Sequence, residues 1–219
     1  MTRDNKHSNL ALQTKWSVVN EVIQIARIRL DKEERKKQIK EAALQLFTEK
    51  GLVRTTMEDI VKRAKLSKGG MYYHYRNKEE IFEELIKDAF SYRKDLVVQY
   101  IDKNPSMSRE DLIMNMLLDK ILDKNPYKII YAIFLTEVRT SKELKALYDK
   151  IYQETKEGFI QFCRSQNLPE YIPLTSEACI FFINSLILGE NMIGNQDEAE
   201  LREMLRLMLT SYLKHKQIF

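Results

Sequence analysis

Residues 55–82, TTMEDIVKRAKLSKGGMYYHYRNKEEIF, constrain the fold of this chain more than any other stretch. Three residues of types that cap helix N-termini, Thr56, Ser67 and Asn77, each precede a segment that can form a helix. The first cap is followed at the third helical position by Asp59, as in a capping box. Two short helices joined by a tight turn and followed by a longer helix are typical of a helix-turn-helix.

The composition of the whole chain favours an all-α fold. Of its 219 residues only 6 are Gly and 4 are Pro, whereas 44% are hydrophobic and 31% are charged. A chain that is poor in helix breakers and rich in Lys, Glu, Leu and Ile is typically helical. Apolar spacing and capping residues predict helices at about 31–50, 55–64, 68–74, 78–100, 108–123, 127–140, 141–166, 175–193 and 197–214, with a loop between Pro169 and Pro173.

Charge is unevenly distributed along the chain, although the overall net charge is only +4. Residues 1–78 hold 18 basic and 9 acidic side chains, a net charge of +9, and residues 79–219 hold 18 and 23, a net charge of −5. A basic N-terminal third on an acidic remainder fits a phosphate-binding part attached to a sensing or assembly body. A solvated basic face would give the same numbers, so charge favours DNA only in combination with the helix-turn-helix.

Several classes of function are disfavoured by motifs that the sequence lacks. No apolar run reaches the roughly 18 residues of a membrane span, and the N-terminus does not resemble a secretory signal, so we expect no membrane association. Cys163 and Cys179 form no CxxC pair, which favours a cytoplasmic location and two buried packing residues. His7, His74 and His215 lack ligand spacing, so we expect no metal and no cofactor. Without a nucleophile elbow or a GxxxxGK loop, no enzyme is expected.

Residues from about 35 to 82 resemble the TetR family of bacterial transcription regulators. The elements IKEAALQLFTEKG, TTMEDIVKRA and LSKGGMYYHYRNKEEIF follow one another in the order and spacing of that family. The sequence departs from the family pattern at Lys65, in a turn position often held by Gly, and at Tyr75, where Phe is common. The resemblance implies an N-terminal three-helix DNA-binding domain followed by a C-terminal helical ligand-binding and dimerisation domain.

The expected domain limits are 32–92 for the DNA-binding domain and 93–219 for the effector-binding and dimerisation domain, after a partly helical extension at 1–31. Residues 16–30 of the extension keep helical spacing. This segment is interpreted as a helix packed on the body or continuous with the next helix. An arm that carries Arg27 and Arg29 to DNA is a further alternative.

The DNA-binding residues are expected at the starts of the two short helices. Thr55 and Thr56 begin the first, where hydroxyls, N–H groups and the helix dipole favour a phosphate, although capping alone would explain Thr56. Lys68 begins the recognition helix and is expected to contact phosphate or bases. Gly69 and Gly70 are poor helix formers whose missing side chains would let the backbone approach DNA; a frayed first turn is the alternative.

The resemblance adds roles for the residues that follow. It implies that Lys68, Gly69 and Gly70 lie against the major groove. It also implies that Tyr72 and His74 hold the DNA backbone, that Tyr73 points toward bases, and that Lys78 contacts phosphate. The alternative for Tyr72 is a place beside Tyr75 in the small three-helix core, where Tyr75 itself is expected.

The C-terminal part is expected to bind an effector and a second subunit. The candidate pocket residues are Tyr100, Tyr131, Phe134, Tyr152, Phe159 and Asn184. By resemblance, residues of about 175–214 form an intersubunit four-helix bundle of a homodimer. The implied function is a repressor that binds a palindromic operator of double-stranded DNA and is released by a small molecule. A helical small-molecule-binding protein or a dimeric scaffold without DNA binding stays open as an alternative.

Overall fold

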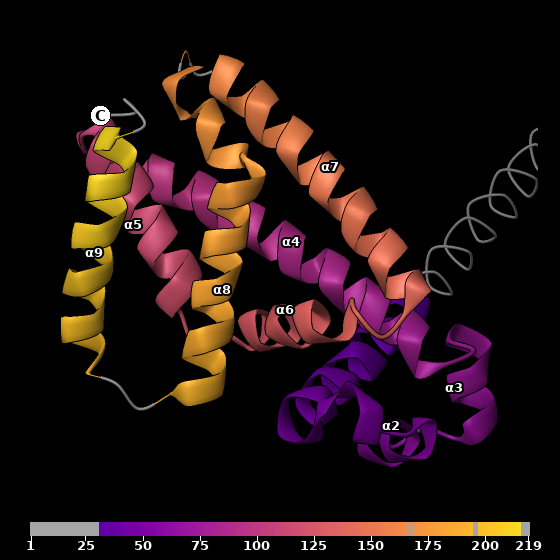
Figure 1. Ribbon diagram of the computed structural model, residues 1–219. Helices are drawn as coiled ribbons and strands as arrows, with labels where there is room; N and C mark the ends of the chain where they lie inside the picture. The colour runs from indigo at the N-terminus through magenta and orange to yellow at the C-terminus, as the bar shows by residue number, and fades with distance from the viewer. Residues whose placement is uncertain (1–30, 166, 168, 195–196, 216–219) are drawn as a thin grey trace, which may run out of the picture.

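The computed structural model describes residues 31–165, 167, 169–194 and 197–215, and every regular element among them is helical. The predicted extension therefore lies outside the described residues, apart from Asp31. Figure 1 shows a helix-turn-helix end at the lower right and a larger helical body at the left, joined by the long helix α4. The predicted all-α fold is confirmed.

The helix-turn-helix consists of residues 31–54, which are helical, α2 (Met57–Arg63) and α3 (Lys68–His74). The caps are those that the sequence predicts: Thr56 forms a capping box with Asp59, and the Ser67 hydroxyl accepts a hydrogen bond from the amide of Gly70. Helical structure continues to residue 54, beyond the predicted end near 50, although Gly51 has a φ of +79°.

The turn between α2 and α3 requires a left-handed backbone at Lys65, whose φ is +52°. This is the position where a glycine is common in the resembling family. A side chain in this conformation costs about 1 kcal/mol relative to glycine. The sequence therefore keeps the turn at some cost in stability and gains an exposed cation there.

Helix α4 (Lys78–Lys103) begins at the cap Asn77 and runs unbroken through residue 92, the expected domain limit. Its first half packs into the core of the helix-turn-helix, and Ile81, Phe82 and Ile86 are fully buried. Two ion pairs fasten it to the 31–54 helix: Lys36 to Glu84 at 2.7 Å and Lys40 to Asp88 at 2.6 Å. The boundary at residue 92 stays a prediction, because the helix itself has no break there.

The body contains α5 (Arg109–Leu122), α6 (Pro126–Glu137), α7 (Lys142–Ser165), the short 3-10 helix η1 (Pro169–Thr175), α8 (Glu177–Ile193) and α9 (Glu198–His215). The predicted loop between Pro169 and Pro173 is wrong, since η1 occupies it. Helix α5 packs on both α8 and α9, and α6 packs on both α4 and α8. No helix in the described part of the chain is long and apolar enough to cross a membrane.

The buried apolar side chains of the described residues form two hydrophobic clusters. The first includes the core of the helix-turn-helix and continues into the body through Ile130, Phe134, Leu144 and Ile151. The second joins α5, η1, α8 and α9, together with Cys163 of α7. Because α6 and α7 contribute to the first cluster, a change in their positions acts directly on residues that support the helix-turn-helix.

Candidate nucleic-acid interface

Helix α3 is anchored by two inward-facing residues and exposes the rest of its surface. Met71 is fully buried, and Tyr75, just after the helix, is 2% exposed and donates a hydrogen bond to Glu84 at 2.6 Å. The expectation that Tyr75 belongs to the core is confirmed. On the outer side, Tyr72 and Tyr73 are 53% and 74% exposed. Large aromatic side chains left in water on a short helix are typical of a surface that another molecule covers.

Lys68 lies at the start of α3 and forms an ion pair of 2.6 Å with Glu58 of α2. Both side chains are mostly exposed. The hydrogen bond to Glu58 raises the pKa of Lys68, so its ammonium stays charged at neutral pH. An exposed pair of this kind is weak in water, and a phosphate can therefore replace Glu58 as the partner of Lys68.

The two glycines of α3 differ in the space around them. A Cβ built at Gly69 would meet no atom of the described chain within 4 Å, whereas one at Gly70 would lie 3.2 Å from the Oγ of Ser67. Packing within the subunit therefore does not explain the glycine at position 69. Close approach of another molecule to the backbone would explain it.

His74 lies at the end of α3, with its ring edge-on to Tyr73 at 5.0 Å between centroids. Its Nδ1 is buried and has no hydrogen-bond partner among the described residues. Burial lowers the pKa of His74 first, and the nearby cations Lys32, Lys36 and Arg35 of the 31–54 helix lower it further. The imidazole is therefore neutral at pH 7, and its expected contact to DNA would be a hydrogen bond without charge.

The structure corrects the expected role of Thr55. Its side chain is fully buried, and its hydroxyl donates to the carbonyl of Gly51 at 2.8 Å. Its amide donates to the carbonyl of Leu52, so neither group is free for a phosphate. Thr56 is exposed, and its amide donates to the Asp59 carboxylate at 2.9 Å, as in a capping box. Contact of Thr56 with DNA stays a prediction.

Lys78 is also placed differently from the expectation. Its Nζ donates to the carbonyls of Leu52, Val53 and Thr55 at 2.9, 3.1 and 2.8 Å. A lysine ammonium has three N–H donors, so all of them are used within the protein. These carbonyls lie at the end of the 31–54 helix, where backbone acceptors lack helical partners. Lys78 therefore ties the start of α4 to the segment before α2.

We expect Lys78→Met to destabilise the protein by about 2 kcal/mol, because three carbonyls lose a charged donor. We also expect weaker DNA binding with an unchanged dependence on salt. Loss of a phosphate contact would instead reduce the salt slope by about one unit. Chemical denaturation and duplex titrations at several salt concentrations measure both. Lys87→Met, at an exposed position on the same helix, is the control and should change neither.

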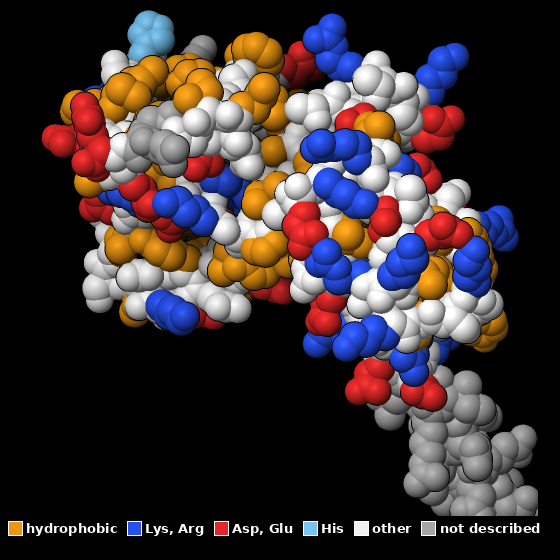
Figure 2. Space-filling model, turned by 90° about the horizontal axis from the view of Figure 1, so that it is seen from below, with side chains coloured by type: hydrophobic (Ala, Val, Ile, Leu, Met, Phe, Trp, Pro, Cys, Tyr) orange, Lys and Arg blue, Asp and Glu red, His pale blue; other side chains and the backbone are white. Residues whose placement is uncertain are grey.

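Other cations surround α3. Figure 2 shows Lys and Arg side chains, with acidic side chains between them, gathered over the helix-turn-helix end at the right of the view. Arg54, Lys62, Lys65 and Arg76 are exposed around the two short helices. In the sequence these four residues stand out only as part of the basic charge of residues 1–78, because their positions around the two short helices follow from the fold.

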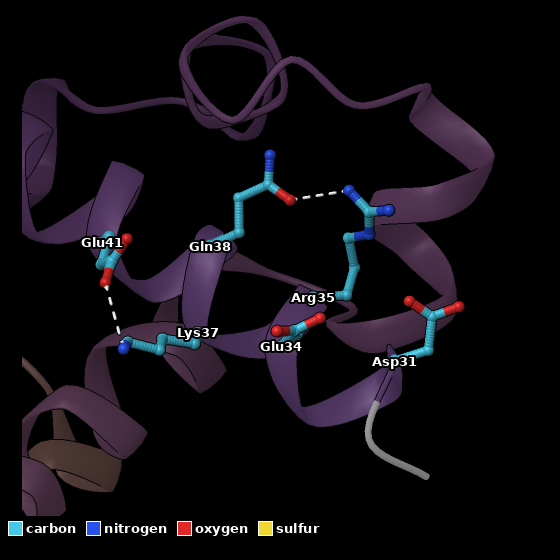
Figure 3. A pocket seen from close by; sticks show the side chains of 6 residues that line it. All are labelled: Asp31, Glu34, Arg35, Lys37, Gln38 and Glu41. Carbon is cyan, nitrogen blue, oxygen red and sulfur yellow. Dashed lines mark hydrogen bonds and ion pairs between the residues drawn. The ribbon is translucent and has the colours of Figure 1, made fainter. Parts of the chain in front are cut away.

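A hollow of about 330 Å³ lies on the 31–54 helix, and Figure 3 shows its described lining. All six of these residues come from one helix: Asp31, Glu34, Arg35, Lys37, Gln38 and Glu41. Arg35 donates to Gln38 at 2.7 Å, and Lys37 pairs with Glu41. An open, charged surface of this kind lacks the apolar walls typical of a small-molecule pocket.

The expected effector residues do not converge on one cavity. A groove of about 460 Å³ between α6, α7 and α8 is lined by Tyr152 and Asn184 of that set. Tyr131 reaches the groove indirectly, since its hydroxyl donates to Asn184 Oδ1 at 3.0 Å.

The other three expected residues lie elsewhere, which corrects their placement in one pocket. Phe134 is fully buried in the first cluster, and Phe159 packs on the second. The Tyr100 hydroxyl contacts the sulfur of Met107, near the end of α4.

Cys163 and Cys179 are buried and form no disulfide within the described residues, as expected of packing residues. Within the described residues no group of three His, Cys, Asp or Glu side chains is placed to hold a metal ion.

A capped helix-turn-helix with an exposed recognition helix that begins at a lysine, attached to a larger helical body, is typical of the class of DNA-binding regulators. Residues 39–85 match the family model described as bacterial regulatory proteins, tetR family. This part of the chain is therefore similar to the DNA-binding domain of that family, and the relatives and solved structures that resemble the longer chain are described as transcriptional regulators.

Relatives of known name include the regulator IcaR, described as the HTH-type negative transcriptional regulator of the biofilm operon icaADBC. The Staphylococcus epidermidis protein is 29% identical over 154 residues, which cover 70% of this chain and 78% of that protein. The Staphylococcus aureus protein is 33% identical over 88 residues, 40% of this chain and 46% of that protein. The aligned part thus spans less than half of the second relative.

Solved structures resemble the whole fold. A TerR/AcrR-family transcriptional regulator from Aquifex aeolicus is 29% identical, with a TM-score of 0.60 over 81% of this chain and 99% of that chain. Salmonella enterica GusR is 16% identical, with a TM-score of 0.57 over 83% of this chain and 97% of that chain, a likeness of fold alone.

Proposed function

We propose that this regulator is a repressor that binds a two-fold symmetric operator as a homodimer and is released by a small molecule. The observation that carries the DNA-binding part is the outer face of α3, where Lys68, Gly69 and Tyr73 are exposed together. A helix of this kind reads only a few base pairs, so two copies held at a fixed separation are needed for specificity. Since the target is DNA, the proposed location is the cytoplasm.

Repression is proposed from the relatives. Both IcaR proteins are named as negative regulators, and the longer alignment extends beyond the helix-turn-helix. A repressor needs only to occupy its operator, and two helix-turn-helix units held together in the dimer suffice for that.

The proposed dimer interface is formed by α8 and α9. These helices expose large apolar side chains that have no partner within the described chain: Phe181, Met192, Ile193, Met204, Leu207 and Met208. Burying one such side chain contributes about 1.5–3 kcal/mol. Two adjacent helices that expose six of them support pairing with a second copy in a four-helix arrangement.

The DNA-binding proposal is tested by selecting duplexes from a random library with the purified full chain. We expect a two-fold symmetric sequence with half-sites about 10 base pairs, one helical turn, apart. Tyr73→Ala should relax specificity at one base position of each half-site and weaken operator binding about tenfold. Lys68→Ala should weaken binding to all sequences and reduce the salt slope by about one unit per subunit. Selection of no sequence above bulk DNA at moderate salt would favour the alternative, a helical binding or scaffold protein.

A further inference from the structure

The groove between α6, α7 and α8, here called the α7–α8 groove, has walls suited to an amphipathic molecule. Leu135 of α6 and Ile180 and Leu188 of α8 supply apolar surface. Tyr152 of α7 and Asn184 of α8 supply polar groups among them. At about 460 Å³ the groove is in the size range of small-molecule sites.

The charged groups of the lining are acidic. Asp149 of α7 and Glu177 of α8 line the groove from its two sides, and no Lys or Arg is among the described residues that line it. Asp149 pairs with Lys145 one turn earlier on α7, but both side chains of that pair are more than half exposed. Such a pair is weak in water. Glu177 has no ion-pair partner among the described residues, so its carboxylate is available to a cation.

The polar and aromatic groups of the groove also favour a cationic ligand with hydrogen-bonding capacity. The Tyr152 hydroxyl is buried and has no hydrogen-bond partner in the described part of the chain. A buried hydroxyl without a partner is unfavourable, and a ligand can supply the missing bond. The faces of Tyr148 and Tyr152 already attract cations, since Lys145 and Lys156 lie over them at 5.8 and 5.9 Å from the ring centroids.

The groove is connected to the helix-turn-helix by a series of ring contacts. Tyr148, in the groove wall, lies 6.1 Å from the buried Phe134 of α6, centroid to centroid. Between ring centroids, Phe134 lies 6.4 Å from Phe82 of α4, and Phe82 lies 5.5 Å from Phe47. Phe47 belongs to the 31–54 helix and is buried in the core of the helix-turn-helix. A ligand that displaces Tyr148 therefore acts on packed side chains that continue to the DNA-binding end.

We propose that the α7–α8 groove binds an organic cation, an amine carried on an aromatic or aliphatic body, and that this ligand is the effector. The ammonium group lies between the carboxylates of Asp149 and Glu177, and the apolar body lies against Ile180 and Leu188. The binding site stands on the groove alone, whereas the effector role rests on the proposed repressor function.

The site is tested by calorimetric titration of the full chain, without DNA, with three probes of one shape: 4-phenylbutylammonium, 4-phenylbutanol and 4-phenylbutanoate. We expect the ammonium to bind at least tenfold more tightly than the alcohol, and the carboxylate not to bind measurably. Glu177→Gln and Tyr152→Phe should each weaken binding of the ammonium probe at least fivefold. Glu110→Gln, at an exposed acid on α5, is the control and should have no effect. The site would be overturned if the ammonium and the alcohol bound with equal affinity. It would also be overturned if the ammonium bound the wild type and Glu177→Gln with equal affinity.

The effector role is tested separately on the selected operator. Saturating 4-phenylbutylammonium should weaken operator binding at least fivefold, and Phe134→Leu should reduce that effect while leaving calorimetric binding of the probe intact. Probe binding without any loss of operator affinity would refute the effector role and leave both the site and the DNA-binding function standing. Probe binding by a chain that selects no operator would refute the repressor function and leave the site standing.

Discussion

Leu207→Glu is expected to convert the protein from a dimer to a monomer at micromolar concentration. Leu207 is 67% exposed on α9, beside Met204 and Met208, which are 49% and 46% exposed. In a symmetric interface the substitution removes two apolar side chains and places two carboxylates in a desolvated region. Burying an unpaired charge costs several kcal/mol, so we expect the dimer dissociation constant to rise at least a hundredfold. Sedimentation velocity between 1 and 50 µM measures the change.

The same variant separates assembly from folding. Because Leu207 is exposed in the isolated subunit, the substitution should leave the helical circular dichroism of the chain unchanged. Val53→Glu is the matched control, since Val53 is 70% exposed in the helix-turn-helix, outside the proposed interface, and the substitution should leave the dimer intact. A Leu207→Glu chain that sediments as a dimer at 1 µM would rule out α9 as the interface.

Loss of the dimer should also weaken binding to the operator. Two linked recognition helices gain affinity because binding of the first raises the effective concentration of the second. The monomeric variant is therefore expected to lose at least a hundredfold in operator affinity while its binding to bulk DNA changes little. Equal operator affinity of wild type and Leu207→Glu would mean that one recognition helix reads the site alone.

The elements whose signals are local were predictable from the sequence. The caps Thr56, Ser67 and Asn77 all occur as predicted, and α3 has the predicted bounds. A cap depends on a side chain and an amide only two or three residues further on, so the sequence contains all of its determinants. The burial of Tyr75 was also predictable, because its position follows from the geometry of one short helix.

The candidate site depends on contacts between distant residues, and there the sequence was insufficient. Lys78 was expected to contact phosphate, but its ammonium binds carbonyls 23–26 residues earlier in the chain. Thr55 is polar and lies beside a helix start, yet its hydroxyl donates a hydrogen bond to the carbonyl of Gly51. Helical periodicity identifies a side chain as buried without indicating which neighbour it contacts, and for that reason Phe134 was interpreted as pocket rather than core.

Gly69→Leu should stabilise the protein and nonetheless weaken its binding to DNA. If Gly69 served only the fold of α3, the substitution would not change stability and DNA affinity in opposite directions. A Cβ at position 69 meets no described atom within 4 Å, and leucine is a better helix former than glycine by about 0.5–1 kcal/mol. In a chain of this size that corresponds to a rise of about 1–3 °C in Tm. At the same time the new side chain would stand between the α3 backbone and the bases.

We expect operator affinity of Gly69→Leu to fall at least thirtyfold, about 2 kcal/mol, measured by fluorescence anisotropy on the selected duplex. Gly69→Ala, with one added carbon, should show a smaller loss and a similar gain in Tm. Gly158→Leu is the control, because Gly158 is an exposed glycine in helix α7 whose Cβ also meets nothing within 4 Å. It should raise Tm without changing DNA affinity. If Gly69→Leu bound the operator as well as Gly158→Leu does, the start of α3 would not lie against DNA, and the outer face of this helix would need another partner.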